Sequence, residues 1–100
     1  MARAPTLVAV SAVQGDDPAE AREDLLAAGV AAYLVLLGAH ARGLAAYWRT
    51  VALLDGPQAR ELLGIPAGES PVGLLYLGTP VQEQRTPERA PVQEILTFLA

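Results

Sequence analysis

The chain has 100 residues, of which 52% are hydrophobic and 18% are charged, and its net charge is −4. A chain of this length forms one small domain at most, so this excess of apolar residues indicates an obligate partner. The sequence has no cysteine, a single histidine and no run of cations. These absences exclude disulfides, thiolate or multi-histidine metal sites, and a basic surface for nucleic acid.

The first expected element is a strand over residues 6–13, with the sequence TLVAVSAV. Successive side chains of a strand point to opposite faces, and here both faces are mostly apolar. We therefore expect this strand to lie in the interior of its sheet. Because an interior strand begins so close to residue 1, we expect the sequence to enter a larger fold midway.

A long helix is expected over residues 17–42. Asp17 is suited to cap its first turn, Pro18 to occupy the first helical position, and Gly43 to end it. From residue 25 onwards the apolar side chains lie on every side, which predicts a helix that is buried all round. Two neighbouring stripes carry most of them, namely Leu26, Val30, Tyr33 and Leu37, and Leu25, Gly29, Ala32 and Leu36.

A membrane span has to be weighed for the same helix, because residues 25–41 carry no charged side chain. A helix of this length reaches roughly 26 Å, which is marginal for a bilayer. The stretch is rich in Ala and Gly, and its charged first turns belong to the same helix. These features favour a dimer core over a membrane anchor. We expect no membrane association and, since residues 1–6 lack a signal-peptide pattern, a cytoplasmic location.

The second half of the chain is expected to form shorter elements. In chain order these are an extended or irregular segment over 44–51, a short helix over 57–63, a turn over 67–71, a strand over 72–79 and a C-terminal tail over 81–100. The strand is again apolar on both faces, and two such strands have too few helices to cover them. The sequence therefore predicts an α+β fold, as a single partial domain over residues 1–100, completed by another copy, another chain or an N-terminal segment.

No residue pattern predicts a catalytic mechanism. Without cysteine and with one histidine, neither a Cys–His pair nor a Ser–His–Asp triad can be assembled. His40 lies in a run expected to be buried, and we expect it to be a helix-end residue with a satisfied ring. Gly38 and Gly43 do not follow a strand in the spacing of a dinucleotide fingerprint. We assign no catalytic residue and no metal ligand.

Four segments carry a resemblance by their order and spacing: HARGL at 40–44, YWRT at 47–50, GPQARELLGIP at 56–66 and VGLLYLGTP at 72–80. From residue 29 to 80 the chain resembles, without gaps, the C-terminal half of nitroreductase-family proteins. The opening Arg3-Ala4-Pro5 followed by a strand fits the middle of that family. The resemblance implies a nitroreductase-like homodimer, with the long helix in the dimer core and two FMN molecules at the interface.

The resemblance also implies an activity. In the family, NAD(P)H delivers a hydride to FMN, which then reduces nitroaromatic or quinone-like acceptors in a ping-pong cycle. The cofactor carries the chemistry, and the protein positions it. The chain would thus be an FMN-dependent NAD(P)H oxidoreductase. The family's N-terminal half, with its arginine-rich phosphate-binding start, has no counterpart here, so activity is expected only when that half is supplied.

The resemblance also implies four cofactor contacts in this chain. Trp48, Arg49 and Thr50 match the segment beside the isoalloxazine ring, where backbone amides hydrogen-bond near the flavin N5 and the indole packs near the ring. Arg89 sits where many members place a cation on the FMN phosphate, and Arg85 is the alternative. From the residues alone, the indole would lie in the core and each guanidinium in solvent.

Two further features of the resemblance bear on the site. Residues 38–43 match a stretch associated with the nicotinamide nucleotide in some members. Val51 stands where the family often has Gly, which bears on how closely the backbone approaches the flavin. Two alternatives to a flavoenzyme stay open. One is a non-catalytic dimerisation or assembly fragment that has lost flavin binding, and the other is a small membrane-anchored protein.

Overall fold

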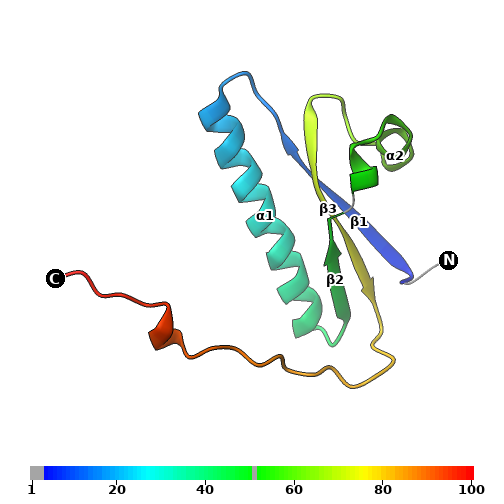
Figure 1. Cartoon of the computed structure of the whole chain (residues 1–100). Helices are drawn as coiled ribbons and strands as arrows, with labels where there is room; N and C mark the ends of the chain where they lie inside the picture. The colour runs from blue at the N-terminus through cyan, green and yellow to red at the C-terminus, as the bar shows by residue number, and fades with distance from the viewer. Residues whose placement is uncertain (1–3, 51) are drawn as a thin grey trace.

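The computed structural model describes residues 4–50 and 52–100 of the chain. The elements, in chain order, are β1 (Thr6–Val13), α1 (Pro18–Ala41), β2 (Ala45–Arg49), the 3-10 turn η1 (Ala52–Asp55), α2 (Pro57–Leu63), β3 (Glu69–Gly78) and the 3-10 turn η2 (Val92–Glu94). Figure 1 shows them arranged as a small sheet between helices, with the C-terminal segment extending away. Arg3 and Val51, which were named in the family resemblance, lie outside the described residues.

The three strands form one antiparallel sheet in the order β1-β3-β2. The strand that comes last in the chain is therefore central. β1 pairs with β3 from Thr6 opposite Leu77 to Val13 opposite Glu69, and β2 pairs only with residues 74–78 of β3. The predicted α+β fold class is confirmed.

The helices lie on opposite sides of this sheet, α1 on one face and η1 with α2 toward the other (Figure 1). Small side chains on α1, Ala32 and Ala39, are buried where the helix meets the strands. Leu75, at the middle of the central strand, is fully buried beneath α1. On the other side, Leu54 of η1 and Ile65 after α2 are buried. Small residues on the inner face allow α1 to approach the sheet closely.

The ends of both helices follow from local chemistry. The Asp17 carboxylate accepts a hydrogen bond from the Ala19 amide at 3.0 Å, so it satisfies a donor that the first turn leaves free. Gly43 and Gly64 follow α1 and α2 with φ of +76° and +68°, a left-handed conformation that glycine adopts without steric cost. The bounds predicted for the two helices agree with these to within a residue.

The prediction that the first strand is interior to its sheet is wrong for the described residues, because β1 is an edge strand. Apolar residues on both faces of a strand indicate that both faces are covered, not that both edges are paired. Inward residues of β1 lie beneath α1, with Ala12 buried. The outward Leu7 and Val13 are more than half exposed in the single chain.

The long helix, predicted to be buried all round in a dimer core, is buried on one side only within the single chain. In the stripe of Leu25, Gly29, Ala32 and Leu36, all but Leu25 are covered or partly covered, whereas the neighbouring stripe is exposed. That outer stripe comprises Leu26, Val30, Tyr33 and Leu37. By length and composition alone, α1 would also qualify as a membrane-spanning helix. Among residues 4–50 and 52–100, nothing covers this outer stripe.

Two local predictions change in the structure. The segment over residues 44–51, predicted to be extended or irregular, contains the regular strand β2, and β3 begins at Glu69 rather than Val72. Residues 69–71 were expected to form a turn, but Pro71 lies within the strand, opposite Ser11. The register shifts between Val10 and Ser11, and an irregularity of this kind accommodates a proline, which has no N–H for the ladder.

Candidate functional site

The residues singled out by sequence, Trp48 to Thr50, lie at the end of β2. Consecutive strand residues point to opposite faces. Trp48 is paired with Leu75 and faces α1, whereas Arg49 is paired with Leu74 and faces the other side of the sheet. The two side chains therefore cannot both contact one face of a planar ligand. Any contact shared by the whole segment has to come from its backbone.

The indole of Trp48 lies between α1 and the sheet. A Cβ placed on Gly29 of α1 would be 3.8 Å from Cη2 of the ring, and a Cβ on Gly73 of β3 would overlap its Nε1. Within the part of the chain that the structure describes, this buried Nε1 meets no hydrogen-bond acceptor. The indole thus lies in the helix–sheet interface, where the residue pattern alone would place it.

Arg49 lies on the opposite face of the sheet beside two tyrosines. It is half-buried, and the strand alternation places Tyr47 on the same face. Tyr47 is directly opposite Tyr76, with ring centroids 6.5 Å apart and planes tilted by 51°. Tyr47 is 63% exposed. This face combines a guanidinium with an aromatic pair, which suits a flat polar ligand or a protein surface.

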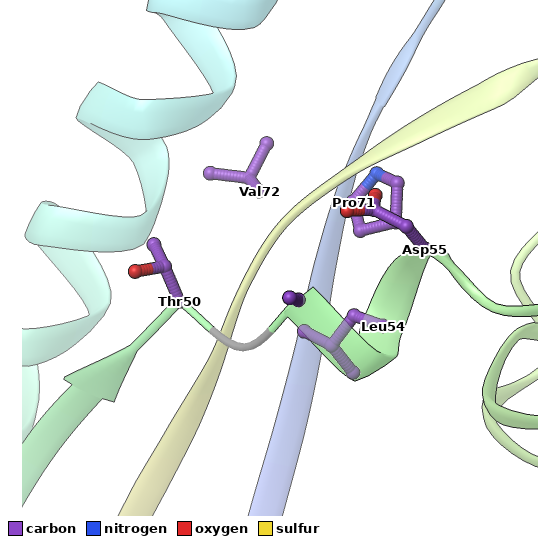
Figure 2. A pocket seen from close by; sticks show the side chains of 6 residues that line it. Thr50, Leu54, Asp55, Pro71 and Val72 are labelled. Carbon is purple, nitrogen blue, oxygen red and sulfur yellow. The ribbon is translucent and has the colours of Figure 1, made fainter.

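Thr50 lines a shallow pocket of about 240 Å³ together with Ala52, Leu54, Asp55, Pro71 and Val72. Figure 2 shows that the lining comes from the end of β2, from η1 and from the start of β3. The pocket forms where β2 ends and leaves residues 69–73 of β3 without a β2 partner. Thr50 and Asp55 are both exposed and give it a polar rim.

Arg89 does not lie at the pocket around Thr50. Every residue from Val81 to Ala100 is exposed, and Figure 1 shows this segment, in orange and red, running past the foot of α1 and away from the sheet. Arg85 lies in the same exposed segment. Neither arginine is part of the pocket around Thr50.

The stretch 38–43 forms the last turn of α1 and its cap. Nη1 of Arg42 donates to the Gly38 carbonyl at 3.1 Å, and the Gly43 amide donates to the His40 carbonyl at 3.0 Å. The expectation that His40 lies in a buried run is wrong, because the residue is exposed. Its position in the last turn of α1 agrees with the expected helix-end residue.

Sequence reasoning missed three residues near these positions. Gly73 lies within an apolar strand pattern, and a glycine inside a strand often marks a close approach. Tyr76 and Asp55 had no sequence signal of their own, because only the pairing of β2 with β3 and the position of η1 bring them to the site.

The fold and the site together define the chain as part of an α+β protein in which an antiparallel sheet is covered by one long apolar helix. Residues 1–79 match the model of the Nitroreductase family, and the chain belongs to that family. The segment at the end of β2 and both helices fall inside the matched range.

Relatives agree with this assignment. The chain is 34% identical over 90 residues to YdjA of Escherichia coli (strain K12), a proposed NAD(P)H nitroreductase, covering 89% of this chain and 49% of the relative. Among solved structures it is similar to a nitroreductase-like family protein from Bacillus cereus, with TM-score 0.80, 24% identity, and coverage of 93% of this chain and 50% of the other.

A second solved structure is a proposed NADH dehydrogenase/NAD(P)H nitroreductase from Parabacteroides distasonis. Its TM-score is 0.69 at 25% identity, with 91% of this chain and 54% of the other covered. The chain thus spans about half the length of the relatives that it matches.

Proposed function

We propose that this chain is the C-terminal half of an FMN-dependent NAD(P)H oxidoreductase that reduces nitroaromatic or quinone-like acceptors. One observation carries the proposal: within the 79 residues that match the Nitroreductase family, the segment Trp48–Thr50 lies at an open strand end beside a pocket. The NAD(P)H nitroreductase activity proposed for the E. coli relative supports the same reaction class.

The residues at the end of β2 fit one edge of a flavin and not the whole molecule. The edge of an isoalloxazine ring offers acceptors at N5 and O4, and the hydroxyl of the exposed Thr50 is a donor of the right kind. The pocket of about 240 Å³ is smaller than the roughly 300–1,000 Å³ of sites that enclose a ligand. The Trp48 indole faces away, into the helix–sheet interface.

In this proposal each residue has a limited role. Bound FMN would supply the hydride-transfer chemistry that links NAD(P)H to the acceptor. Arg49 and Thr50 hold the polar edge of the ring, and their position at the end of a paired strand keeps them in place. Arg89, with Arg85 as the alternative, provides the cation for the FMN phosphate.

The remaining walls have to come from outside the described residues. We propose a homodimer in which α1 of each copy covers the other, together with a segment equivalent to the N-terminal half of the relatives. The exposed outer stripe of α1 supports this arrangement. Residues 25–41 carry no charge, and covering this apolar surface removes it from water at a gain in free energy. We place the assembly in the cytoplasm.

A second candidate is a non-catalytic assembly module. The same exposed stripe of α1 favours it, because that surface suits dimerisation whether or not flavin is bound. In this case the family fold persists and the flavin contacts are absent. The two candidates differ in one property, the binding of FMN.

The proposal is tested by mixing the chain with FMN, alone and with a polypeptide equivalent to the relatives' N-terminal half, and adding NADH or NADPH without oxygen. The flavin band should bleach faster than free FMN does, and menadione or a nitroaromatic compound should restore it. If the flavin band bleaches in both mixtures at the rate of free FMN, the oxidoreductase proposal is wrong. That result would favour the non-catalytic assembly module.

A further inference from the structure

The close contact between Gly73 and Trp48 has a consequence for the end of β2. Trp48 Nε1 and Cδ1 lie against the position where a side chain of residue 73 would begin. A Cβ there would overlap Nε1 and would lie 2.6 Å from Cδ1. No real Cβ approaches a ring carbon so closely, so any other residue at 73 must displace the indole.

The same position also touches the backbone of the proposed flavin segment. A Cβ on Gly73 would lie 3.1 Å from the carbonyl oxygen of Arg49. Gly73 is buried in the central strand, and its neighbour Leu74 pairs with Arg49. A side chain at residue 73 would therefore press on both the ring of Trp48 and the main chain of Arg49.

The indole is held from the other side by α1. Its Cη2 lies within van der Waals distance of the position of a Gly29 side chain, at 3.8 Å. The ring thus spans the space between helix and sheet, with a glycine at each end. Packed interiors leave little freedom for a large side chain at such a site.

We propose that Gly73 is a positioning residue: by admitting the Trp48 indole beneath α1, it fixes the backbone of Arg49 and Thr50 at the rim of the pocket. Trp48 then serves the site through the main chain that it anchors, and its ring does not touch the cofactor. The functional consequence rests on the flavin site proposed above, whereas the structural part does not.

The experiment compares Gly73→Ala with Gly68→Ala in the full chain. Gly68 precedes β3 and has no atom within 4 Å of its Cβ position, so it is a matched control. Trp48 is the single tryptophan, so tryptophan fluorescence reports only on the packing of this indole between α1 and Gly73. We expect Gly73→Ala to shift the emission to longer wavelength and to raise amide exchange at residues 48–50 by roughly tenfold, with little change elsewhere. Gly68→Ala should leave both unchanged.

FMN binding by the same variants tests the functional part. Misplacing the end of β2 should weaken FMN binding by about tenfold in Gly73→Ala and not in Gly68→Ala. If the emission and the exchange change while FMN affinity does not, the positioning role is wrong. If the unmodified chain binds no FMN in either mixture described above, the oxidoreductase proposal fails, and fluorescence and exchange still decide whether Gly73 fixes the strand end.

A double variant covers the case in which Gly73→Ala does not fold. Trp48→Val removes both ring atoms that would overlap the added methyl group and keeps an apolar β-branched residue in the strand. The combination of Trp48→Val with Gly73→Ala keeps only the 3.1 Å contact with the Arg49 carbonyl, which a small shift relieves, and it should then fold as well as Trp48→Val alone. Failure of the combination to fold, or unchanged emission and exchange in Gly73→Ala, would overturn the inference.

Discussion

The guanidinium of Arg60 in α2 donates to the main-chain carbonyl of Glu69, at the first residue of β3, over 2.8 Å. It also donates to the Pro66 carbonyl at 3.1 Å. One side chain therefore ties α2 to the loop and the strand that follow it. The Glu69 carboxylate in turn accepts from Ser11 of β1 at 2.6 Å, so the contact continues across the sheet.

Arg60→Ala should destabilise the chain by about 1–3 kcal/mol, because it leaves two carbonyls without their charged donor. Arg22→Ala is the matched control, since Arg22 is exposed in the first half of α1. Denaturant unfolding followed by circular dichroism measures both. Equal stability of the two variants would show that Arg60 does not secure α2.

Leu75→Ala should lower the free energy of unfolding by about 2–5 kcal/mol, because Leu75, in the central strand, is fully buried beneath α1. Leu62, on α2, is 86% exposed, and Leu62→Ala should change the unfolding free energy by no more than about 0.5 kcal/mol. Thermal or chemical unfolding distinguishes the two. A loss for Leu75→Ala as small as that for Leu62→Ala would contradict the position assigned to the core.

The helices could be predicted from the sequence because their signals are local. Asp17, Pro18 and Gly43 each act on the nearest turn, and the structure has α1 within a residue of the expected bounds. The strand order could not be predicted. Apolar faces on β1 indicate cover by other elements, and they carry no information about which strand lies at the edge.

The candidate site was predictable only in part. The family resemblance drew attention to Trp48, Arg49 and Thr50, and the strand that contains the first two is present. The opposite directions of Trp48 and Arg49 follow from strand alternation once β2 is regular. The contact with Gly73 needed the pairing of β2 with β3, because residues 48 and 73 meet only through that register.

Val30→Asp should abolish self-association if α1 forms the dimer core, because it places a charge in the outer apolar stripe, where desolvation is costly. Val30 is 61% exposed in the single chain, so the monomer fold should survive. Sedimentation equilibrium measures the change. Leu62→Asp, exposed on a different surface, is the control and should not alter the dimer.

Arg49→Ala and Arg89→Ala should each weaken FMN binding by about 10–100-fold, the loss expected for one charged hydrogen bond. Arg22→Ala, remote on α1, should leave the affinity unchanged. Arg85→Ala separates the two tail arginines, since only the residue that meets the phosphate should matter. Quenching of flavin fluorescence on titration measures each affinity. Unchanged binding in Arg49→Ala would remove that residue from the site.

The most direct measurement of the central claim is the visible absorption spectrum of the chain eluted from a sizing column, with and without added FMN and with the polypeptide equivalent to the relatives' N-terminal half. We expect flavin absorbance to co-elute, in a stoichiometric amount, with a dimeric species, at least in the mixture that contains the added polypeptide. A colourless dimer in every mixture would leave the chain in its family and contradict the proposed role as a flavoenzyme.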